Sequence, residues 1–231
     1  MEAIVLAGGF GTRLSHIVSD VPKPMAPVGH KPFLEYILMD LVDSGVDHIV
    51  IAVHYLKETI MEHFGSCFYG AEVDYSIEDV PLKTGGAIKK SLSFCREERV
   101  LVVNGDTFYK VPLQQMHQFA EASGKQIVIA VKEMTDFSRY GKVDVDKRGL
   151  ITAFHEKEFC SKGFINGGVY DIDKQVLDPY PEAFSMEEQC FPRVLEHRQI
   201  AAFQSDGYFI DIGVPEDYAK AQIDFKRFHG E

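Results

Sequence analysis

Short apolar runs alternate with amphipathic stretches through the first half of this 231-residue chain, and this alternation constrains the fold more than any other feature. It is typical of βαβ units, in which parallel strands form a central sheet covered by helices. The clearest helix is expected at residues 33–43, because apolar side chains recur there at helical spacing between Pro32 and Gly45. Further helices are expected at 57–64, 84–94 and 113–122, and strands at 2–7, 48–53, 72–77, 100–103 and 126–131.

The pattern changes from about residue 139 to short alternating segments separated by turn residues, which favours antiparallel strands. Ser185-Met-Glu-Glu188 has the form of a helix capping box, and Pro215 opens a final helix. Strands are expected at 142–146, 165–172 and 201–204. The sequence therefore predicts an α/β fold with a mixed, mostly parallel central sheet.

Composition and charge exclude several classes of protein. The formal net charge of −11 argues against a nucleic-acid partner, since such partners require a basic surface. Anionic substrates would need a few local cations and a metal ion. No apolar run approaches the roughly 20 residues of a membrane span, so no membrane partner is expected. The four cysteines form no CxxC pair and no export signal is evident, so we expect reduced thiols in a cytoplasmic protein.

The first expected strand runs into a glycine-rich loop at residues 8–13. Because glycine has no Cβ, backbone N–H groups in such a loop can close around a phosphate or press against a base. The dinucleotide fingerprint G-x-G-x-x-G is not met, because Gly9-x-Gly11 is followed by Leu14, and no Walker motif is present. By itself the loop is equally consistent with a tight turn.

Two aspartates follow apolar segments far apart in the chain. Asp106 follows the run at 100–103 and should lie at the carboxyl end of a central strand, where α/β sheets bind ligands. Asp211 lies in an apolar segment just before the last helix. Mg²⁺ commonly takes one or two carboxylates, so this pair would suffice. Taken singly, Asp106 is equally a turn residue and Asp211 a buried salt-bridge or hydrogen-bond anchor.

These motifs together resemble the sugar-1-phosphate nucleotidyltransferase family, whose LAGGxGTRL signature and following KP pair match residues 6–14 and Lys23-Pro24. The resemblance implies a Rossmann-like three-layer fold of the nucleotide-diphospho-sugar transferase type. It also implies a single domain at 1–231, with a nucleotide-binding half at about 1–135, a sugar-binding half at about 136–231 and no C-terminal β-helix.

The same resemblance implies the site residues. Arg13 would contact the leaving pyrophosphate, Lys23 the α-phosphate region, and Asp106 and Asp211 would hold catalytic Mg²⁺. The nucleotide-binding set would be Leu6, Ala7, Gly8, Gly9, Gly11, Thr12, Arg13, Lys23, Glu78, Thr84, Gly85, Gly86 and Asp106. The sugar-phosphate-binding set would be Tyr140, Gly141, Glu156, Lys157, Asn166 and Gly167. Two alternatives stay open: a solvated charge pair for Glu156 and Lys157, and a packing role for Tyr140.

The implied reaction fits the residues the chain offers. The nucleophile would be a phosphate oxygen of the sugar 1-phosphate, which is already largely ionised at pH 7. No general base is then required, and the sequence shows no Ser-His-Asp arrangement. The remaining tasks are positioning and charge stabilisation, for which the implied cations and metal are suited.

The segment 76–87 bears on the choice of base. Thr84 is a candidate helix cap, and Gly85 and Gly86 allow a flat base to approach the backbone. Glu78 is able to accept hydrogen bonds from the adjacent N–H donors of guanine, which favours GTP, although it is equally an exposed charge at a strand end.

Residues 1 to about 220 resemble the D-glycero-α-D-manno-heptose 1-phosphate guanylyltransferase branch most. The matching segments include KPMAPV at 23–28, TGGAIK at 84–89, NGDTF at 104–108 and YFIDIGVPEDY at 208–218. The chain departs from this branch at Lys83, where relatives commonly have glycine. Alternatives are a uridylyltransferase or mannose-1-phosphate guanylyltransferase on the same scaffold, and a non-catalytic nucleotide-binding regulator. The oligomeric state, a homo-oligomer included, stays open.

Overall fold

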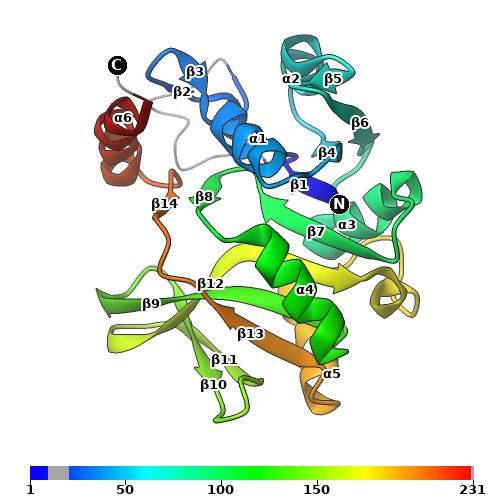
Figure 1. Ribbon diagram of the computed structural model, residues 1–231, viewed down its shortest axis with the longest axis vertical. Coiled ribbons are helices and arrows are strands. Elements are labelled where there is room, and N and C mark those ends of the chain that lie inside the picture. The colour runs from blue at the N-terminus through cyan, green and yellow to red at the C-terminus, as the bar shows by residue number, and fades with distance from the viewer. Residues whose placement is uncertain (10–20, 230–231) are drawn as a thin grey trace.

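A parallel group of four strands forms the centre of the molecule. The computed structural model describes residues 1–9 and 21–229 (Figure 1). Within them β1 (Glu2–Leu6) lies between β4 (His48–Val53) and β7 (Arg99–Asn104), and β6 (Ala71–Ile77) pairs with β4, all in parallel. The carboxyl ends of these strands therefore meet at one edge of the sheet.

The second half of the chain extends this sheet in antiparallel fashion. The long β12 (Cys160–Asp173) pairs with β7 and with β9 (Ile127–Phe137), and β13 (Ile200–Gln204) runs parallel to β9. The hairpin β10 (Gly141–Val145) and β11 (Ile151–Lys157) also joins β12, and β5 (Cys67–Phe68) lies at the other edge. Among the described residues ten strands thus form one mixed sheet.

Helices cover both faces of the sheet, as Figure 1 shows. They are α1 (Phe33–Asp43), α2 (Lys57–Phe64), α3 (Lys83–Ser91), α4 (Leu113–Ser123), α5 (Phe191–Glu196) and α6 (Pro215–His229). Successive strand residues point to opposite faces, so Val5 packs in the core under α1, α4 and α6, and Ile4 packs in the core under α3 and α5. The predicted three-layer α/β fold with a mixed sheet is confirmed.

Local elements agree with expectation where a hydrophobic period is strong. Helices α1 and α2 and strand β4 have the predicted bounds, and β9 continues six residues beyond the predicted end at 131. The Ser185 side chain accepts the Glu188 amide as predicted, but the helix that it caps is a π-helix, Met186–Cys190. Within the described part of the chain six strands are not predicted, namely β5, β11, β2 (Pro27–Val28), β3 (Lys31–Pro32), β8 (Thr107–Tyr109) and β14 (Phe209–Asp211).

Two further expectations concern the whole chain. No helix within residues 1–9 and 21–229 is long and apolar enough to cross a membrane. The four cysteines are free thiols.

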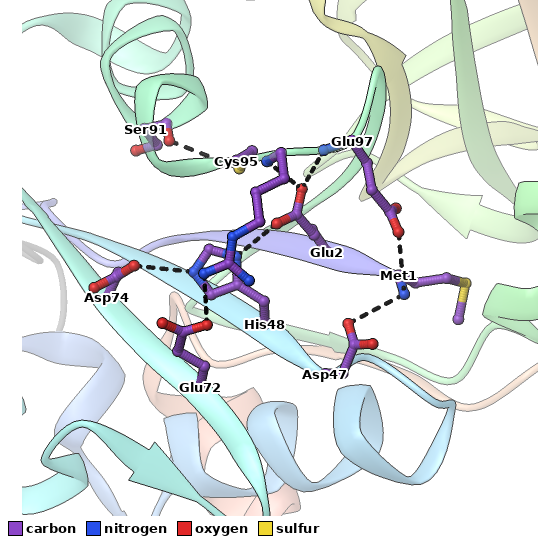
Figure 2. A network of polar contacts seen from close by, with 10 residues as sticks. Met1, Glu2, Asp47, His48, Glu72, Asp74, Ser91, Cys95 and Glu97 are labelled. Carbon is purple, nitrogen blue, oxygen red and sulfur yellow. Dashed lines mark hydrogen bonds and ion pairs between the residues drawn. The ribbon is translucent and has the colours of Figure 1, made fainter.

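The amino ends of the parallel strands are joined by a buried polar network (Figure 2). The His48 ring lies between two carboxylates, with Nδ1 2.7 Å from Glu2 Oε1 and Nε2 3.0 Å from Asp74 Oδ2. Glu2 Oε2 also accepts the amides of Arg96 and Glu97, both at 2.7 Å. Burial opposes ionisation of Glu2, but these amides and His48 outweigh it and lower its pKa below the ordinary value.

The two carboxylates on His48 differ in exposure, and this difference gives a test of what stabilises the sheet. Glu2 is 4% exposed and Asp74 is 41% exposed. Glu2→Gln removes the buried negative charge that accepts the Arg96 and Glu97 amides and contacts His48, so it should lower the free energy of unfolding by about 3 kcal/mol. Asp74→Asn, the matched control, should cost about 1 kcal/mol or less because water replaces the lost contact. Urea unfolding of both variants checks this, and equal costs would contradict it.

Because the pKa of Glu2 is lowered on folding, its contribution to stability is present above the carboxyl's ordinary pKa and is lost as pH falls through the lowered folded value. The difference in stability between the original protein and Glu2→Gln should therefore shrink below about pH 4. A difference that stays constant to lower pH would contradict this account.

Candidate active site

A cavity of about 440 Å³ opens at the carboxyl ends of the parallel strands. Each strand contributes its last residue or the loop that follows: Leu6 and Gly8 from β1, His54 after β4, Glu78 after β6, and Asn104 from β7. The described lining also includes Gly9, Lys23, Pro24, Ala52, Pro81, Lys83, Thr84, Ala87, Asp106 and Gly213. The sheet edge predicted to bind ligands thus carries the cavity.

Strand pairing brings the two predicted metal ligands together. Asp106 precedes β8 and Asp211 ends β14, and these strands pair antiparallel with Asp211 opposite Thr107. The Ile212 amide also donates to the Asp106 carbonyl at 3.1 Å. Asp106 and Asp211 are therefore neighbours because of a short two-stranded ladder that no periodicity in the sequence predicts.

Lys23 lies against both carboxylates. Its Nζ is 2.6 Å from Asp106 Oδ2 and 3.7 Å from Asp211 Oδ1, and its side chain is 11% exposed. Burial and then the charge of Asp106 raise the pKa of Asp211 above its ordinary value, and Lys23 and the Gly213 amide offset this only in part. Two carboxylates that share one lysine suit a site for a cation.

Glycine at position 213 is required by this cluster. A Cβ there would lie 2.8 Å from Asp211 Oδ1 and 3.1 Å from Lys23 Nζ. The Gly213 amide donates to Asp211 Oδ1 at 2.7 Å and fixes the carboxylate. In the described residues no group of three or more His, Cys, Asp or Glu side chains is arranged to hold a metal, so a metal here would rely on the two aspartates.

Glu78 is buried, which contradicts the interpretation of an exposed charge at a strand end. It is 7% exposed and lines the cavity, and its Oε2 accepts the Leu82 amide at 3.0 Å. Its Oε1 lies where a Cβ on Gly8 would approach to 3.0 Å. The His54 Nδ1 contacts the Glu78 carbonyl at 2.7 Å. Glu78 therefore shapes the loop before α3 and still presents a carboxylate oxygen beside the glycine loop.

Thr84 lines the cavity, but the prediction that it caps a helix is wrong. The N-cap of α3 is Leu82 and has no side-chain cap. The Thr84 hydroxyl instead donates to Glu187 at 2.7 Å and accepts the Met186 amide at 3.0 Å. The Thr84 hydroxyl thus bonds to the π-helix from the other half of the chain instead of to the backbone of α3. A local sequence pattern does not predict such a distant partner.

Gly85 and Gly86 are buried against a segment of the second half of the chain. Both amides donate to the Phe184 carbonyl, at 2.9 and 3.2 Å. A Cβ on Gly85 would lie 2.2 Å from the Phe184 ring, and one on Gly86 would lie 2.2 Å from the Glu182 carbonyl. Neither glycine is among the described residues that line the cavity, so their small size serves packing beneath the loop.

The predicted acceptor residues are not gathered in the same cavity. Tyr140 lines a second cavity of about 340 Å³ together with Arg139, Asp211 and Asp217. Gly141 allows close approach of β11, because a Cβ there would lie 2.3 Å from the His155 carbonyl. Glu156 and Lys157 are exposed on β11, as in the alternative of a solvated pair.

Asn166 and Gly167 lie at a bulge in β12, beside the end of β7. Asn166 donates to the Tyr170 hydroxyl and accepts the Gly168 amide. Gly167 faces Tyr109, whose ring a Cβ would meet at 2.3 Å, and Gly168 faces Asn104 in the same way at 2.6 Å. The N-x-G segment thus abuts the cavity through Asn104 without lining it.

Three predicted residues, Gly11, Thr12 and Arg13, lie outside the described residues. Ala7 is buried behind the lining, where its amide donates to the Ala52 carbonyl. The sequence analysis did not assign His54, Pro81, Lys83 or Asn104 to the site, although all four line the cavity. Their common signal is position, since each follows or ends a segment at the sheet edge.

Lys83 carries an unusual backbone conformation. Its φ of 61° is in the left-handed region, which costs an L-residue roughly 1–2 kcal/mol and glycine nothing comparable. Glycine would adopt this conformation with less strain than lysine does.

Comparison with known proteins agrees with this geometry. The nucleotidyl transferase family model matches residues 2–227. The chain is 45% identical to the D-glycero-alpha-D-manno-heptose 1-phosphate guanylyltransferase of Campylobacter jejuni, covering 94% of this chain and 97% of that one. It is 42% identical to the enzyme of the same name from Aneurinibacillus thermoaerophilus, covering 99% and 100%.

A solved structure shares the fold over nearly its whole length. HddC from Yersinia pseudotuberculosis, complexed with GMP-PN, superposes with a TM-score of 0.86 at 35% identity, covering 97% of this chain and 99% of that one. With a family model that spans nearly the whole chain, and with the strand-end cavity and paired aspartates described above, the chain belongs to the nucleotidyl transferase family.

Proposed function

We propose that this protein transfers GMP from GTP to D-glycero-α-D-manno-heptose 1-phosphate, giving a GDP-sugar and pyrophosphate. The observation that carries the proposal is the cluster of Lys23, Asp106 and Asp211 at the cavity that also holds the Glu78 carboxylate. The two heptose 1-phosphate guanylyltransferases described above support the choice of substrates. The GMP-PN complex of HddC supports a guanine nucleotide.

In the proposed reaction a phosphate oxygen of the sugar 1-phosphate attacks the α-phosphorus of GTP. The new P–O bond forms as the bond to the β-phosphate oxygen breaks, and the electron pair leaves with pyrophosphate. The attacking phosphate is already largely ionised at pH 7, so no side chain must remove a proton. The protein's contribution is to align two polyanions and to stabilise charge at the reacting phosphorus.

Asp106 and Asp211 would hold a divalent cation, for which we propose Mg²⁺. Carboxylate oxygens are the ligands this ion prefers, and it commonly takes one or two of them. Burial first and Asp106 next raise the pKa of Asp211, and the two carboxylates share one lysine. When bound, the ion would neutralise developing charge on the phosphoryl oxygens. Lys23, at 2.6 Å from Asp106, is placed to transfer its ion pair to a phosphate of the substrate.

The acceptor residues remain part of the proposal. Tyr140 and Asp211 line the second cavity, so an acceptor held there would lie beside the carboxylate pair. The proposed roles of Glu156 and Lys157 require the acceptor to extend along β11. Asn166 and Gly167 keep their proposed contacts with the sugar. Arg13 and the loop residues Gly11 and Thr12 keep their proposed phosphate contacts.

Loss of either aspartate should stop turnover without unfolding the protein. Asp106→Asn and Asp211→Asn should each lower kcat by about 100-fold or more, the range for removal of a key electrostatic contact. Pyrophosphate release with GTP, acceptor and Mg²⁺ measures this. Asp178→Asn, an exposed aspartate outside both cavities, is the control and should keep full activity. A fall in Tm that parallels the fall in activity would instead indicate structural anchors.

The choice of base should depend on Glu78. In Glu78→Gln the amide oxygen can keep the Leu82 contact, and the NH₂ group then faces the two N–H donors of guanine. We expect kcat/KM for GTP to fall by about 10–100-fold, and that for UTP to change less. Asp79→Asn, an exposed neighbour, is the matched control. An unchanged GTP-to-UTP ratio would remove Glu78 from base recognition, and a preference of the original protein for UTP would overturn the guanylyltransferase proposal.

A further inference from the structure

Lys83 combines three features that its neighbours do not share. It is a cation, it lines the larger cavity, and its backbone is left-handed. Among the described non-glycine residues with left-handed φ, namely Leu56, Tyr69, Lys83, Asp136 and Arg198, it is the one that lines this cavity. A strained residue at a ligand cavity is a reason to look for a role of its side chain.

The strain persists because the loop is held on both sides of Lys83. On one side the Leu82 amide donates to the buried Glu78 carboxylate at 3.0 Å. On the same side the Leu82 carbonyl accepts the Phe184 amide at 3.1 Å. On the other side the Gly85 and Gly86 amides donate to the Phe184 carbonyl. With residues 82 and 85 fixed, the backbone between them has little freedom to relax.

The ammonium group of Lys83 is only weakly engaged. Its partner in the described structure is Glu188, with Nζ 3.4 Å from Oε2, and both side chains are largely exposed at 59% and 71%. Exposed ion pairs contribute little to stability. A ligand in the cavity therefore competes easily for this lysine.

Glu78 and Lys83 are five residues apart in the chain, carry opposite charges, and both line the cavity. Guanine has donors at N1 and the 2-amino group along one edge and acceptors at O6 and N7 along the next. A lysine donating to O6 and N7 is among the commonest specific contacts to this base. A carboxylate matches the donor edge in the same way.

We propose that Lys83 is a specificity residue that donates to the O6 and N7 acceptors of guanine while Glu78 accepts from N1 and the 2-amino group on the adjacent edge. This inference rests on the proposed guanylyltransferase function. In this proposal Lys83 and Glu78 recognise the base together. The left-handed backbone at Lys83 directs the lysine side chain towards the cavity. Adenine, which carries an amino donor in place of O6, is disfavoured by the same group.

The test compares bases that differ by one acceptor. The original protein, Lys83→Met and the control Lys147→Ala are assayed with GTP and 7-deaza-GTP, which lacks N7, using one acceptor. Lys147 is an exposed cation on the turn between β10 and β11 that lines neither cavity. We expect the original protein and Lys147→Ala to prefer GTP over 7-deaza-GTP by about 10-fold in kcat/KM. In Lys83→Met that preference should shrink markedly, because GTP loses the contacts at O6 and N7 whereas 7-deaza-GTP has only the contact at O6 to lose.

ITP, which lacks the 2-amino group but keeps O6 and N7, provides the complementary arm. The fall in kcat/KM for ITP relative to GTP should be the same in Lys83→Met as in the original protein, since the missing 2-amino group would face Glu78. An unchanged preference for GTP over 7-deaza-GTP in Lys83→Met overturns the proposal. An equal loss with every nucleotide overturns it too, because Lys83 then contacts phosphate. A preference of the original protein for UTP or dTTP instead shows that the proposed function itself has failed.

Two further variants guard against a folding defect and test the backbone argument. Lys83→Gly and Lys83→Ala both remove the charge, but only glycine adopts a φ of 61° without strain. Lys83→Gly should therefore have the higher Tm, and it repeats the nucleotide test in a loop free of strain. A higher Tm for Lys83→Ala would contradict the left-handed conformation on which the inference depends.

Discussion

The ladder between β8 and β14 places two carboxylates side by side, and the rest of the site is arranged around this fact. Neighbouring like charges repel, and the repulsion is stronger where burial lowers the effective dielectric. Lys23 relieves part of the repulsion between Asp106 and Asp211, and the Gly213 amide relieves another part. The pKa of Asp211 is nevertheless raised, by burial first and by Asp106 next. Two carboxylates that share one lysine make this site favourable for a cation.

The parts of the fold that the sequence predicts are those specified by a local period. Helix α1 has its predicted bounds because six of its apolar side chains are buried on one face. Strand β4 is predicted as well, because all six of its residues are buried. The two-residue and three-residue strands β2, β3, β8 and β14 are too short to show a period, and their pairing is decided by partners far along the chain.

The candidate site divides in the same way. Strand-end positions such as Asp106 and Glu78 were accessible to sequence reasoning because the parallel sheet fixes where its carboxyl ends lie. The burial of Glu78 and the true partner of Thr84 were not, since both depend on contacts with Leu82, Glu187 and Met186 that only the tertiary structure forms. His54 belongs to no motif, and Asn104 opens the NGDTF segment without a role of its own, so only their place at the sheet edge marks them.

The loop before α3 makes the two halves of the chain depend on one another. Phe184 contacts Gly85 and Gly86 through its carbonyl and leaves no room for a side chain at Gly85. The glycines predicted to admit a base therefore admit a supporting segment instead, and the base-facing surface is left to Glu78, Pro81 and Lys83. Rigid support from behind lowers the entropy lost when a ligand binds, since the loop is already ordered.

Buried charges are compensated to different degrees at the two ends of the parallel strands. The amino ends contribute to stability, and the carboxyl ends are suited to ligand binding. At the amino ends, Glu2 is matched by two amides and His48, so its burial is compensated within the protein. At the carboxyl ends, Asp106 and Asp211 share Lys23, and compensation is incomplete. The chain's net charge of −11 would repel anionic substrates, but that field is screened beyond about 10 Å at ordinary ionic strength. Within the cavity the electrostatic potential is set by a few charged groups at short range. A protein of this net charge is therefore able to bind two polyanions if a cation binds between Asp106 and Asp211.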